Sequence, residues 1–396
     1  MTFALSALTA CAGDDSSSNV ATSSSSTGST NSSGSTDTEA MGNVVVETSL
    51  VIDGETIDTT DLVMLSINGV DVSFDEFRYY WLGVKSNYDY AGVEITADEL
   101  RDWCEYYLKE SYGIIALGEE NDIQYTETEG NTFTNEYGAY LMQFKSEDEY
   151  KKKLEQMFMT DNCVQQFLRT EIYSNKIYTE LFTEGGKYYV SEEDFRAVAE
   201  TDEYARVIHI LIPYCAKTTL TEEDLEAWDE LTTQQKMTKL ENAYDKLTDE
   251  EKEAVKAESK KLADEVLQKA KDGEDFYQLI ADYNYDPGMA LTDKDDITSI
   301  DGYYFTKDYS FVQEFLDGSF ALEVDEISDI VESKDYGYHI IKRLPIDKEY
   351  FDANIESLLG EYNKTIFNKT YNDYLENSIT IEYGEYFEKL TLDSIK

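Results

Sequence analysis

The run Arg206-Val-Ile-His-Ile-Leu-Ile212 is almost wholly apolar and rich in β-branched residues, and Tyr336-Gly-Tyr-His-Ile-Ile-Lys342 repeats its character. Both runs predict short buried strands. The chain has only two histidines in 396 residues, and His209 and His339 stand in the middle of these two runs. Because side chains alternate along a strand, each imidazole is predicted to lie on the face opposite its two neighbours. Either histidine alone is readily explained as a hydrogen-bonded core residue, but two in matching contexts favour one shared site.

The composition is strongly acidic, with 33 basic and 83 acidic residues and a formal net charge of -50. Such a charge repels phosphate backbones and anionic lipid headgroups, which argues against nucleic acid as a partner. Hydrophobic residues make up 41% of the chain, with 32 Tyr and 17 Phe, enough for packed cores. The composition therefore predicts an acidic folded protein, and the length allows two or three domains.

Metal chemistry has little support in the sequence. Two histidines and four scattered cysteines give no spacing typical of a zinc or copper site, and no segment matches a calcium loop. Cys104 and Cys163 fall in helical patterns and could form a disulfide outside the cell, although buried free thiols explain them at least as well. The many carboxylates are interpreted as solvated surface.

Several ordered motifs resemble those of the parvulin-type peptidyl-prolyl isomerases. The two histidine-bearing runs resemble the opening and closing strands of that domain. The motifs between them are similar in order and type, namely the helix Lys260–Gly273, the segment Asp275–Ala281, Asn284-Tyr-Asp-Pro287, Phe311-Val-Gln-Glu-Phe315, Ser319-Phe-Ala-Leu322 and Glu326-Ile-Ser-Asp-Ile-Val331. The resemblance covers roughly residues 203–345, and several motifs in one order make it specific.

The resemblance implies an α+β fold with a parvulin domain at residues 201–346, in which helices surround a small antiparallel sheet. Residues 44–200 resemble, more loosely, the mainly helical chaperone domain of the SurA and PrsA foldases. In such proteins the C-terminal segment, here residues 347–396, completes the chaperone domain. We therefore expect the parvulin domain to be inserted between the two parts of a SurA-N-like chaperone domain.

Local patterns add detail to the two flanking segments. Ser73 with Glu76 and Thr96 with Glu99 predict capping boxes at two helix starts. Further helical patterns follow around residues 133–144 and 147–185. The tail is helical to about Asn377, and we expect its apolar stripe to pack back on the N-terminal helices. The residues of this stripe are Phe351, Ile355, Leu358, Leu359, Tyr362 and Ile366.

The resemblance assigns a proline-binding pocket. Phe311 and Phe315 occupy the positions whose side chains line that pocket, and their i,i+4 spacing predicts that both rings share one helical face. Two core aromatic residues would give the same pattern. Tyr336 falls where a Ser or Thr is common and could supply a hydroxyl to the polar network of the site, and an outward-facing Tyr is equally plausible.

The resemblance also assigns the polar floor of the site. His209 and His339 match a histidine pair that hydrogen-bonds beneath the substrate, and Asp286 matches the Cys or Asp position beside the reacting bond. An exposed Asp in the turn Asp286-Pro-Gly288 is the competing interpretation. Rotation about an X–Pro bond changes no covalent bond, so the implied catalysis requires no metal or cofactor.

Residues 214–248 depart from the family pattern. Parvulins usually run more directly from the first strand to the first long helix, whereas here two helical starts, Thr221-Glu-Glu-Asp224 and Thr248-Asp-Glu-Glu251, occur in an acidic stretch. This extra helical arm either shapes access to the site or decorates it, and we favour decoration. Beyond Lys217 the segment is mostly acidic, so recognition of a phosphorylated substrate is not expected.

Two further departures concern glycines. The glycine-rich motif expected before Phe305 is reduced to Gly302, which predicts a reshaped substrate groove and weak activity. The glycine usual before Glu326 is replaced by Asp325, a residue that accepts a left-handed turn better than most. The isomerase resemblance therefore carries the open question of whether catalysis is retained.

The N-terminal residues resemble a targeting signal. Residues 1–11 form a short apolar run that ends in Leu8-Thr9-Ala10-Cys11 and resembles a bacterial lipobox, with Cys11 as the lipidation site. Residues 12–43 are a Ser/Thr-rich tract that is typical of a disordered tether. The segment predicts an extracytoplasmic protein that is lipid-anchored to the outer face of a bacterial cytoplasmic membrane, of the Gram-positive type.

Three functions remain open from the sequence. The favoured one is a peptidyl-prolyl isomerase and chaperone, a foldase whose partners are unfolded or partly folded secreted polypeptides with X–Pro bonds. The second is a holdase chaperone with an inactive parvulin domain, and the third is an acidic surface lipoprotein that binds solutes or cell-wall polymers. A homodimer is an option on which the sequence is silent.

Overall fold

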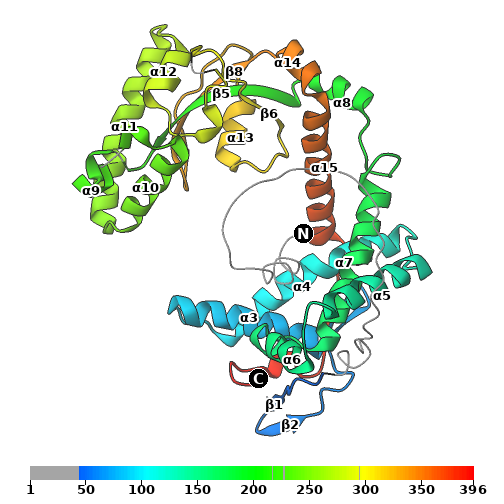
Figure 1. The fold of residues 1–396 in the computed structure, drawn as a ribbon. Coiled ribbons are helices and arrows are strands. Elements are labelled where there is room, and N and C mark those ends of the chain that lie inside the picture. The colour runs from blue at the N-terminus through cyan, green and yellow to red at the C-terminus, as the bar shows by residue number, and fades with distance from the viewer. Residues whose placement is uncertain (1–43, 216, 226–227, 294) are drawn as a thin grey trace. The chain divides into compact units, whose positions relative to one another are not determined.

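The computed structural model describes residues 44–215, 217–225, 228–293 and 295–396 (Figure 1). The expected lipidation site Cys11 and the expected tether at residues 12–43 lie outside them. The chain divides into two compact units. Of the described residues, unit 1 comprises 44–187 together with Thr370–Lys396, and unit 2 lies within Tyr188–Lys369. The division falls inside the long helix α15 (Ile355–Asn377), so unit 1 is assembled from two separate stretches of the chain.

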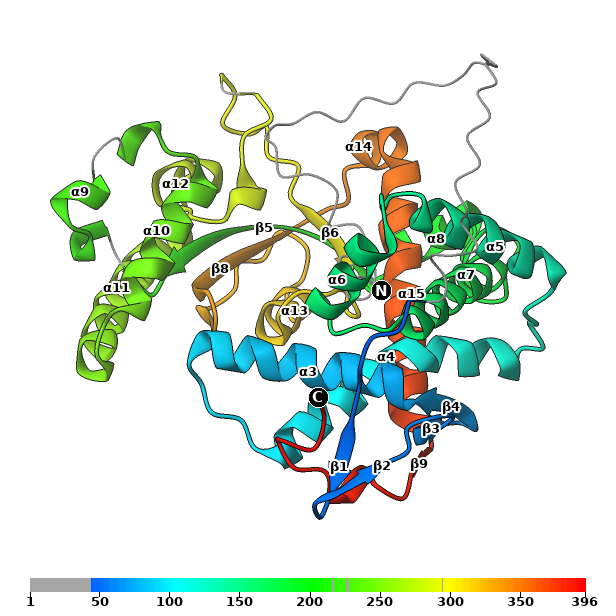
Figure 2. The same ribbon diagram turned by 60° about the horizontal axis from the view of Figure 1, so that its bottom comes forward.

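Unit 1 is mainly helical. Its elements are β1 (Leu50–Ile52), β2 (Glu55–Ile57), β3 (Val63–Ile67), β4 (Val70–Ser73), α3 (Phe74–Ala91), α4 (Ala97–Glu120), α5 (Glu127–Leu141), α6 (Glu147–Gln156), α7 (Asp161–Phe182), the end of α15, β9 (Ile381–Tyr383) and the 3₁₀ turn η4 (Phe387–Lys389). The C-terminal strand β9 pairs antiparallel with β3, which gives a three-stranded sheet of order β4-β3-β9 (Figure 2).

The helix starts of unit 1 follow the capping residues. Thr96 and Glu99 form the predicted capping box at α4. Ser73 caps α3 by accepting a hydrogen bond from the Glu76 N–H, but the second half of the predicted box is wrong. The Glu76 side chain does not return to the cap. It is buried in the core of unit 1, where the Tyr112 hydroxyl donates to its carboxylate.

The helical pattern around residues 147–185 forms two helices, α6 and α7. The helical conformation is interrupted at Phe158, whose φ of 56° is left-handed and incompatible with a continuous right-handed helix. α7 then restarts at Thr160, whose side chain accepts a hydrogen bond from the Cys163 N–H. Cys104 and Cys163 are buried thiols and are not joined to each other, which favours the free-thiol interpretation.

Unit 2 is built on a four-stranded antiparallel sheet of order β6-β5-β8-β7. Its elements are α8 (Glu192–Ala199), β5 (Tyr204–Pro213), α11 (Asp249–Lys271), α12 (Phe276–Tyr283), the 3₁₀ turn η3 (Pro287–Met289), β6 (Tyr303–Thr306), α13 (Gln313–Phe320), β7 (Val331–Ser333), β8 (Gly337–Leu344), α14 (Lys348–Ala353) and the start of α15. The central pair β5–β8 runs in register from Arg206 opposite Leu344 to Pro213 opposite Gly337.

The two faces of this sheet carry different cores. One face presents Ile208, Ile210 and Ile340 to α11 and α12, where they pack against residues such as Val266 and Leu279. The other presents Val207 and Ile341 to α13, where they pack against Phe305, Phe315 and Leu316. Helices thus cover both faces in Figure 1. The predicted small antiparallel sheet surrounded by helices is confirmed.

The described residues of the arm at 214–248 form a helical connection between β5 and α11. It contains the short turns η1 (Lys217–Thr219), α9 (Glu222–Leu225) and η2 (Trp228–Glu230), followed by α10 (Thr233–Asp245). α10 begins at a capping box formed by Thr232 and Gln235. The arm has a small core of its own, formed by Cys215, Leu220, Trp228 and Leu240.

The apolar stripe of the tail packs elsewhere than predicted. Phe351, Ile355, Leu358, Leu359 and Tyr362 cluster with Phe195 of α8 and Tyr204 of β5, inside unit 2. The expected contact of this stripe with the N-terminal helices is therefore wrong. Of the helix α15 itself, the last part belongs to unit 1, where the Tyr371 hydroxyl donates a hydrogen bond to the Glu110 carbonyl.

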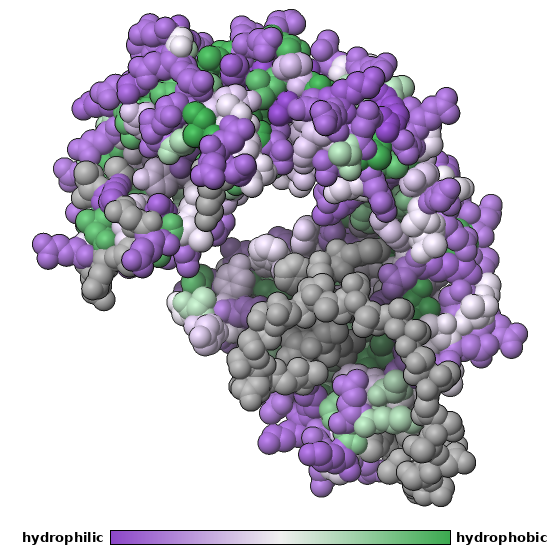
Figure 3. Space-filling model, turned by 45° about the horizontal axis from the view of Figure 1, so that its top comes forward, coloured by the Kyte–Doolittle hydropathy of each residue, from purple (hydrophilic) through white to green (hydrophobic). Residues whose placement is uncertain are grey.

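The exposed surface is dominated by hydrophilic residues on the face drawn in Figure 3, as the net charge of -50 leads one to expect. Within the described ranges, no helix combines the length and the apolar character needed to cross a membrane.

Candidate functional site

The two histidines meet on one face of the sheet in unit 2. His209 on β5 is paired with Ile341, and His339 on β8 is paired with Leu211, so the imidazoles stand diagonally across the two central strands. Diagonal neighbours on one face of an antiparallel pair lie within reach of ring side chains. The two Nδ1 atoms are 3.3 Å apart, and His209 and His339 are only 2% and 4% exposed to solvent. The predicted shared site is present.

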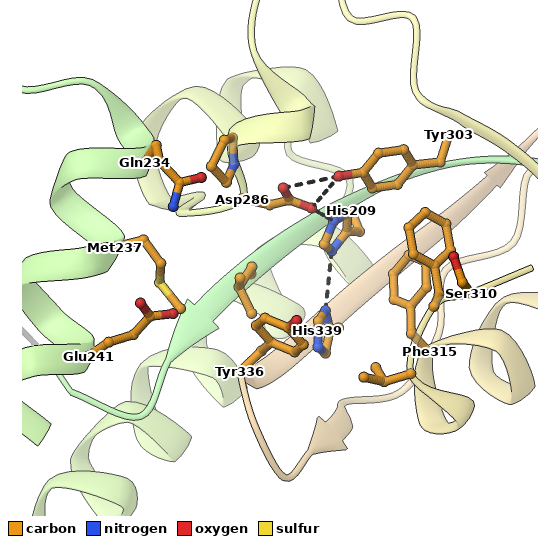
Figure 4. A pocket seen from close by; sticks show the side chains of 14 residues that line it. His209, Gln234, Met237, Glu241, Asp286, Tyr303, Ser310, Phe315, Tyr336 and His339 are labelled. Carbon is orange, nitrogen blue, oxygen red and sulfur yellow. Dashed lines mark hydrogen bonds and ion pairs between the residues drawn. The ribbon is translucent and has the colours of Figure 1, made fainter. Parts of the chain in front are cut away.

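Asp286 lies next to the histidine pair (Figure 4). Its Oδ2 is 2.5 Å from His209 Nε2, and its Oδ1 accepts a hydrogen bond from the Gly288 N–H at 2.7 Å. The residue does begin the Asp-Pro-Gly turn of the competing interpretation, as the cap of η3, yet its carboxylate faces the histidines. Turn and site thus use the same residue.

Asn284 fixes the Asp286 loop to the sheet. Its side-chain Oδ1 accepts hydrogen bonds from the backbone N–H groups of Leu211 and Asp286, and its Nδ2 donates to the Asp286 carbonyl at 2.7 Å. The loop that bears the carboxylate is therefore clamped to β5, two residues from His209.

Two hydroxyl groups that the sequence did not identify complete the polar chain. The Tyr303 hydroxyl on β6 donates to the Asp286 carboxylate, 2.9 Å from Oδ2, and Ser333 Oγ on β7 lies 2.8 Å from His339 Nε2. Tyr303 belongs to the stretch that departs from the family's glycine-rich motif, so the resemblance gave no signal for it. Ser333 follows no recognisable spacing, and only the pairing of β7 with β8 brings it to His339.

The site combines an ionised carboxylate with a neutral imidazole at His339. Burial alone would raise the pKa of Asp286, but hydrogen bonds from His209, the Gly288 N–H and Tyr303 outweigh burial and hold that pKa below its ordinary value. Burial, followed by repulsion from His209, lowers the pKa of His339 to about 3. Asp286 is therefore ionised and His339 neutral near pH 7.

One hydrogen-bond arrangement gives every ring nitrogen of the pair a partner. The Ser333 hydroxyl donates to His339 Nε2, the His339 Nδ1–H donates to His209 Nδ1, and the His209 Nε2–H donates to Asp286. All donors then point toward the carboxylate. Such an array stabilises and orients one negative charge in a buried setting.

Aromatic side chains stand over this polar chain. Phe315 contacts both imidazoles, with ring centroids 4.8 Å from His209 and 5.3 Å from His339. Phe311 packs against Tyr303 at 4.9 Å. The prediction that both phenylalanines share one helix is wrong, because α13 begins at Gln313 and Phe311 precedes it. Both still line one pocket.

That pocket has a volume of about 260 Å³ and lies entirely within unit 2. Its walls combine the polar chain with apolar side chains, and its lining residues are His209, Leu211, Gln234, Met237, Glu241, Asp286, Pro287, Tyr303, Ser310, Phe311, Val312, Phe315, Tyr336 and His339. All six residues that the sequence assigned to this site are among them. An apolar socket with a buried, fixed charge can hold a small apolar ring next to a polar bond.

The position of Tyr336 favours the outward-facing alternative. It lines the pocket but is 44% exposed, so it lies at the mouth (Figure 4). The hydroxyl groups bonded to His339 and Asp286 come from Ser333 and Tyr303 instead.

The arm is more than decoration, contrary to our expectation. Gln234, Met237 and Glu241 of α10 line the pocket and extend toward it in Figure 4. One wall of the site is thus supplied by residues 214–248, the segment for which the family resemblance offered no counterpart.

Comparison with known proteins gives consistent results. Residues 195–345 match the model of the PPIC-type PPIase domain. The foldase protein PrsA of Oceanobacillus iheyensis is 31% identical over 271 residues, which cover 65% of this chain and 80% of that protein. The foldase protein PrsA of Halalkalibacterium halodurans is 35% identical over 112 residues, which cover 28% of this chain and 31% of that protein.

Solved structures of similar proteins carry the same name. The peptidylprolyl isomerase PrsA of Bacillus cereus is 17% identical, with a TM-score of 0.29 over 81% of this chain and 93% of that one. The foldase protein PrsA of Streptococcus pneumoniae is also 17% identical, with a TM-score of 0.27 over 79% and 90% of the two chains. The sequence matches show that the chain belongs to the PrsA foldase family and carries a PPIC-type peptidyl-prolyl isomerase domain, as the resemblance predicted.

Proposed function

We propose that the pocket of unit 2 binds proline and catalyses cis/trans rotation of the preceding peptide bond in unfolded or partly folded polypeptides. The observation that carries this proposal is the hydrogen-bonded chain Ser333–His339–His209–Asp286, which runs from buried residues to the half-buried Asp286 beside an aromatic-lined pocket. Phe311 and Phe315 supply apolar surface for the proline ring.

The barrier to be lowered is roughly 18–20 kcal/mol and comes from amide resonance. In the planar amide the carbonyl oxygen carries partial negative charge and the nitrogen partial positive charge, and both diminish as the bond twists. A fixed carboxylate near that oxygen disfavours the planar form more than the twisted one. Every 1.4 kcal/mol or so of this difference speeds rotation about tenfold.

In this scheme Asp286 acts through its charge, and the histidines act through Asp286. His209 and Tyr303 donate to the carboxylate and hold it ionised and in place. His339 holds the His209 ring in turn, as Ser333 holds that of His339. No proton needs to leave a residue during rotation, so the site works by preorganisation.

The proposal is tested with the full chain and a short X–Pro peptide, by measuring cis/trans exchange in magnetisation-transfer NMR. Asp286→Asn keeps the shape of the side chain and removes its charge, and we expect the exchange rate to fall about 10- to 100-fold. Asp282→Asn is the matched control, because Asp282 is exposed on the neighbouring helix α12, where its carboxylate accepts a hydrogen bond from Gln278, and it does not line the pocket. An unchanged rate for Asp286→Asn, or no catalysis by the wild type, contradicts the proposal.

Unit 1 is proposed to hold client polypeptides. Its support is a group of exposed aromatic side chains on α3 and α4, of which Tyr90 is 96%, Tyr106 52% and Trp103 37% exposed. Aromatic side chains provide large contact areas for extended peptides at low entropic cost. Trp103→Ala with Tyr106→Ala should weaken suppression of aggregation of an unfolded client and leave peptide isomerisation unchanged; equal suppression by wild type and variant would rule this role out.

Lipid anchoring through Cys11, at the outer face of a cytoplasmic membrane, is likewise a proposal. Its support is the lipobox-like sequence Leu8-Thr9-Ala10-Cys11 followed by a Ser/Thr-rich tract. A Cys11→Ala variant expressed in a Gram-positive host should move from the membrane fraction to the soluble fraction. Retention of the variant in the membrane fraction would show that the anchor lies elsewhere.

A further inference from the structure

The wall that α10 contributes to the pocket has a definite chemistry. Gln234, Met237 and Glu241 are spaced at i, i+3 and i+7, so they occupy one face of the helix. Met237 is 5% exposed and provides apolar surface, whereas Gln234 and Glu241 are exposed. The face therefore presents a polar amide, an apolar thioether and a carboxylate to whatever lies in the pocket.

The charge of the pocket is one-sided. Of its fourteen lining residues, which all belong to the described part of the chain, Glu241 and Asp286 are acidic and none is Lys or Arg. Asp286 has its partners in His209 and Tyr303. The Glu241 side chain makes no ion pair or hydrogen bond with any residue that the structure describes, and it is exposed at the pocket.

The lysines of α10 do not offset this charge inside the pocket. Lys236 lies on a different face and packs its ammonium 5.9 Å from the centroid of the Trp228 ring, and neither Lys236 nor Lys239 is among the lining residues. The ammonium of Lys217, at the start of the arm, also lies over the Trp228 ring, 5.3 Å from its centroid. These cations brace the arm on its own core.

Capping and packing hold α10 in place beside the pocket. α10 starts at a complete capping box, and Leu240, next to Glu241, is 1% exposed in the small core that the arm forms with Trp228 and Cys215. A group held on a capped, packed helix discriminates between ligands better than one on a free loop.

We infer that α10 makes this isomerase selective for X–Pro segments with a Lys or Arg next to the proline, and that Glu241 is the residue that determines this selectivity. The inference rests on the proposed function of the pocket. The long apolar stem of Lys or Arg packs on Met237 and on the exposed ring of Tyr336, while its cationic head reaches Glu241. An acidic neighbour of proline meets two carboxylates of like charge instead.

The experiment uses the full chain and a series of proline peptides with Lys, Ala or Glu at the position before or after proline. Both turnover (kcat/KM for isomerisation) and binding are measured, each at low and at high salt. The variants are Glu241→Gln, Glu241→Lys and the control Glu258→Gln, which removes the same charge from an exposed position on α11 that does not line the pocket.

The wild type should prefer Lys over Glu at one flanking position about three- to fivefold, which is the size expected for a partly exposed ion pair. Glu241→Gln should abolish this preference, Glu241→Lys should invert it, and Glu258→Gln should keep it. The preference should also shrink in high salt, because exposed charges are screened.

The outcomes separate this inference from the proposed function. Efficient turnover of the Ala peptides with equal rates for Lys and Glu, or a preference that survives Glu241→Gln, overturns the inference and leaves the isomerase intact. Absence of both turnover and binding for every peptide overturns the two together. Binding with the predicted preference but without turnover supports the selectivity of α10 and contradicts catalysis.

Discussion

His209 and His339 face each other through their Nδ1 atoms, 3.3 Å apart, although neither is the register partner of the other. The contact depends on a diagonal between β5 and β8, so the strand register alone brings the two rings together. A shift of the register by one residue would send one imidazole to the opposite face, into the apolar core with Ile208 and Ile340. The geometry of the site is thus fixed by the sheet.

Ser333→Ala removes the hydroxyl bonded to His339 Nε2. We expect kcat to fall about 3- to 10-fold with little change in KM, because Ser333 positions a ring and does not touch the substrate. The chain has only two histidines, so ¹⁵N-labelled histidine gives an uncrowded NMR spectrum, and the variant should shift the ring nitrogens of both. Unaltered ¹⁵N shifts of His209 would show that the hydrogen-bond chain is not continuous.

Gly288→Ala is expected to act through Tyr303. A Cβ at position 288 would lie 1.8 Å from the Tyr303 hydroxyl, so that hydroxyl must leave the Asp286 carboxylate. The loss of activity should match that of Tyr303→Phe. In the double variant the two losses should not add, since both remove one hydrogen bond. Full additivity would indicate that Gly288→Ala disturbs the turn in some other way.

Phe315→Ala removes the ring that contacts both histidines and the core around Phe305. Because Phe315 is 3% exposed, the variant should lose about 3–5 kcal/mol of unfolding free energy in unit 2. Its KM for proline peptides should rise as well. Phe315→Leu is the comparison, as it restores most of the volume, and it should recover stability more fully than affinity.

The stability of unit 2 should fall in acid. The pKa of His339 is lowered to about 3 in the folded state, below the value near 6.5 in the unfolded chain. The unfolded state therefore binds the extra proton first, and stability that is fully present above pH 6.5 is lost as the pH falls toward 3, by up to about 5 kcal/mol. Urea unfolding followed by the fluorescence of Trp228 in the arm measures this trend, and His339→Gln should flatten it.

Unit 1 should respond in the opposite direction through Glu76. Burial, opposed in part by the Tyr112 hydrogen bond, raises the pKa of Glu76 to about 7. A raised pKa stabilises the protonated fold, so this contribution is complete below pH 4.5 and is lost as the pH rises through 7, by about 3 kcal/mol.

Glu76→Gln isolates the Glu76 contribution from the general charge of the protein. The difference in unfolding free energy between Glu76→Gln and wild type should grow between pH 4.5 and 7, as monitored by the buried Trp81. Glu119→Gln, an exposed position on α4, should show no such growth. A difference independent of pH would mean that Glu76 is not the group that titrates.

Much of the site could be predicted because its residues lie in regular elements or short motifs. Period-two alternation placed each histidine on the face opposite its two neighbours, their matching contexts favoured one shared site, and the family resemblance located Asp286. Gly302 survives from the family's glycine-rich motif for a visible reason, since its φ is 81° and a Cβ there would lie 2.6 Å from the Val207 carbonyl oxygen. Asp325 takes the left-handed turn expected of it, with φ of 71°.

The failures share a physical cause, which is tertiary packing that no local pattern encodes. Ser333 reaches His339 only because β7 pairs at the edge of the sheet. Glu76 has the spacing of a capping-box residue, but burial with Tyr112 took its side chain away from the helix start. The apolar stripe of the tail packs against Phe195 and Tyr204, because α14 and the start of α15, which carry it, lie inside unit 2.

The polar chain and the acidic wall come from different kinds of segment. The former is held by paired strands and a clamped turn, and the latter by a connection that leaves β5 after Pro213 and rejoins the domain where α11 begins at Asp249. Exchanging this one connection for that of another family member should therefore change the preference for residues next to proline and leave the residues that catalyse rotation in place.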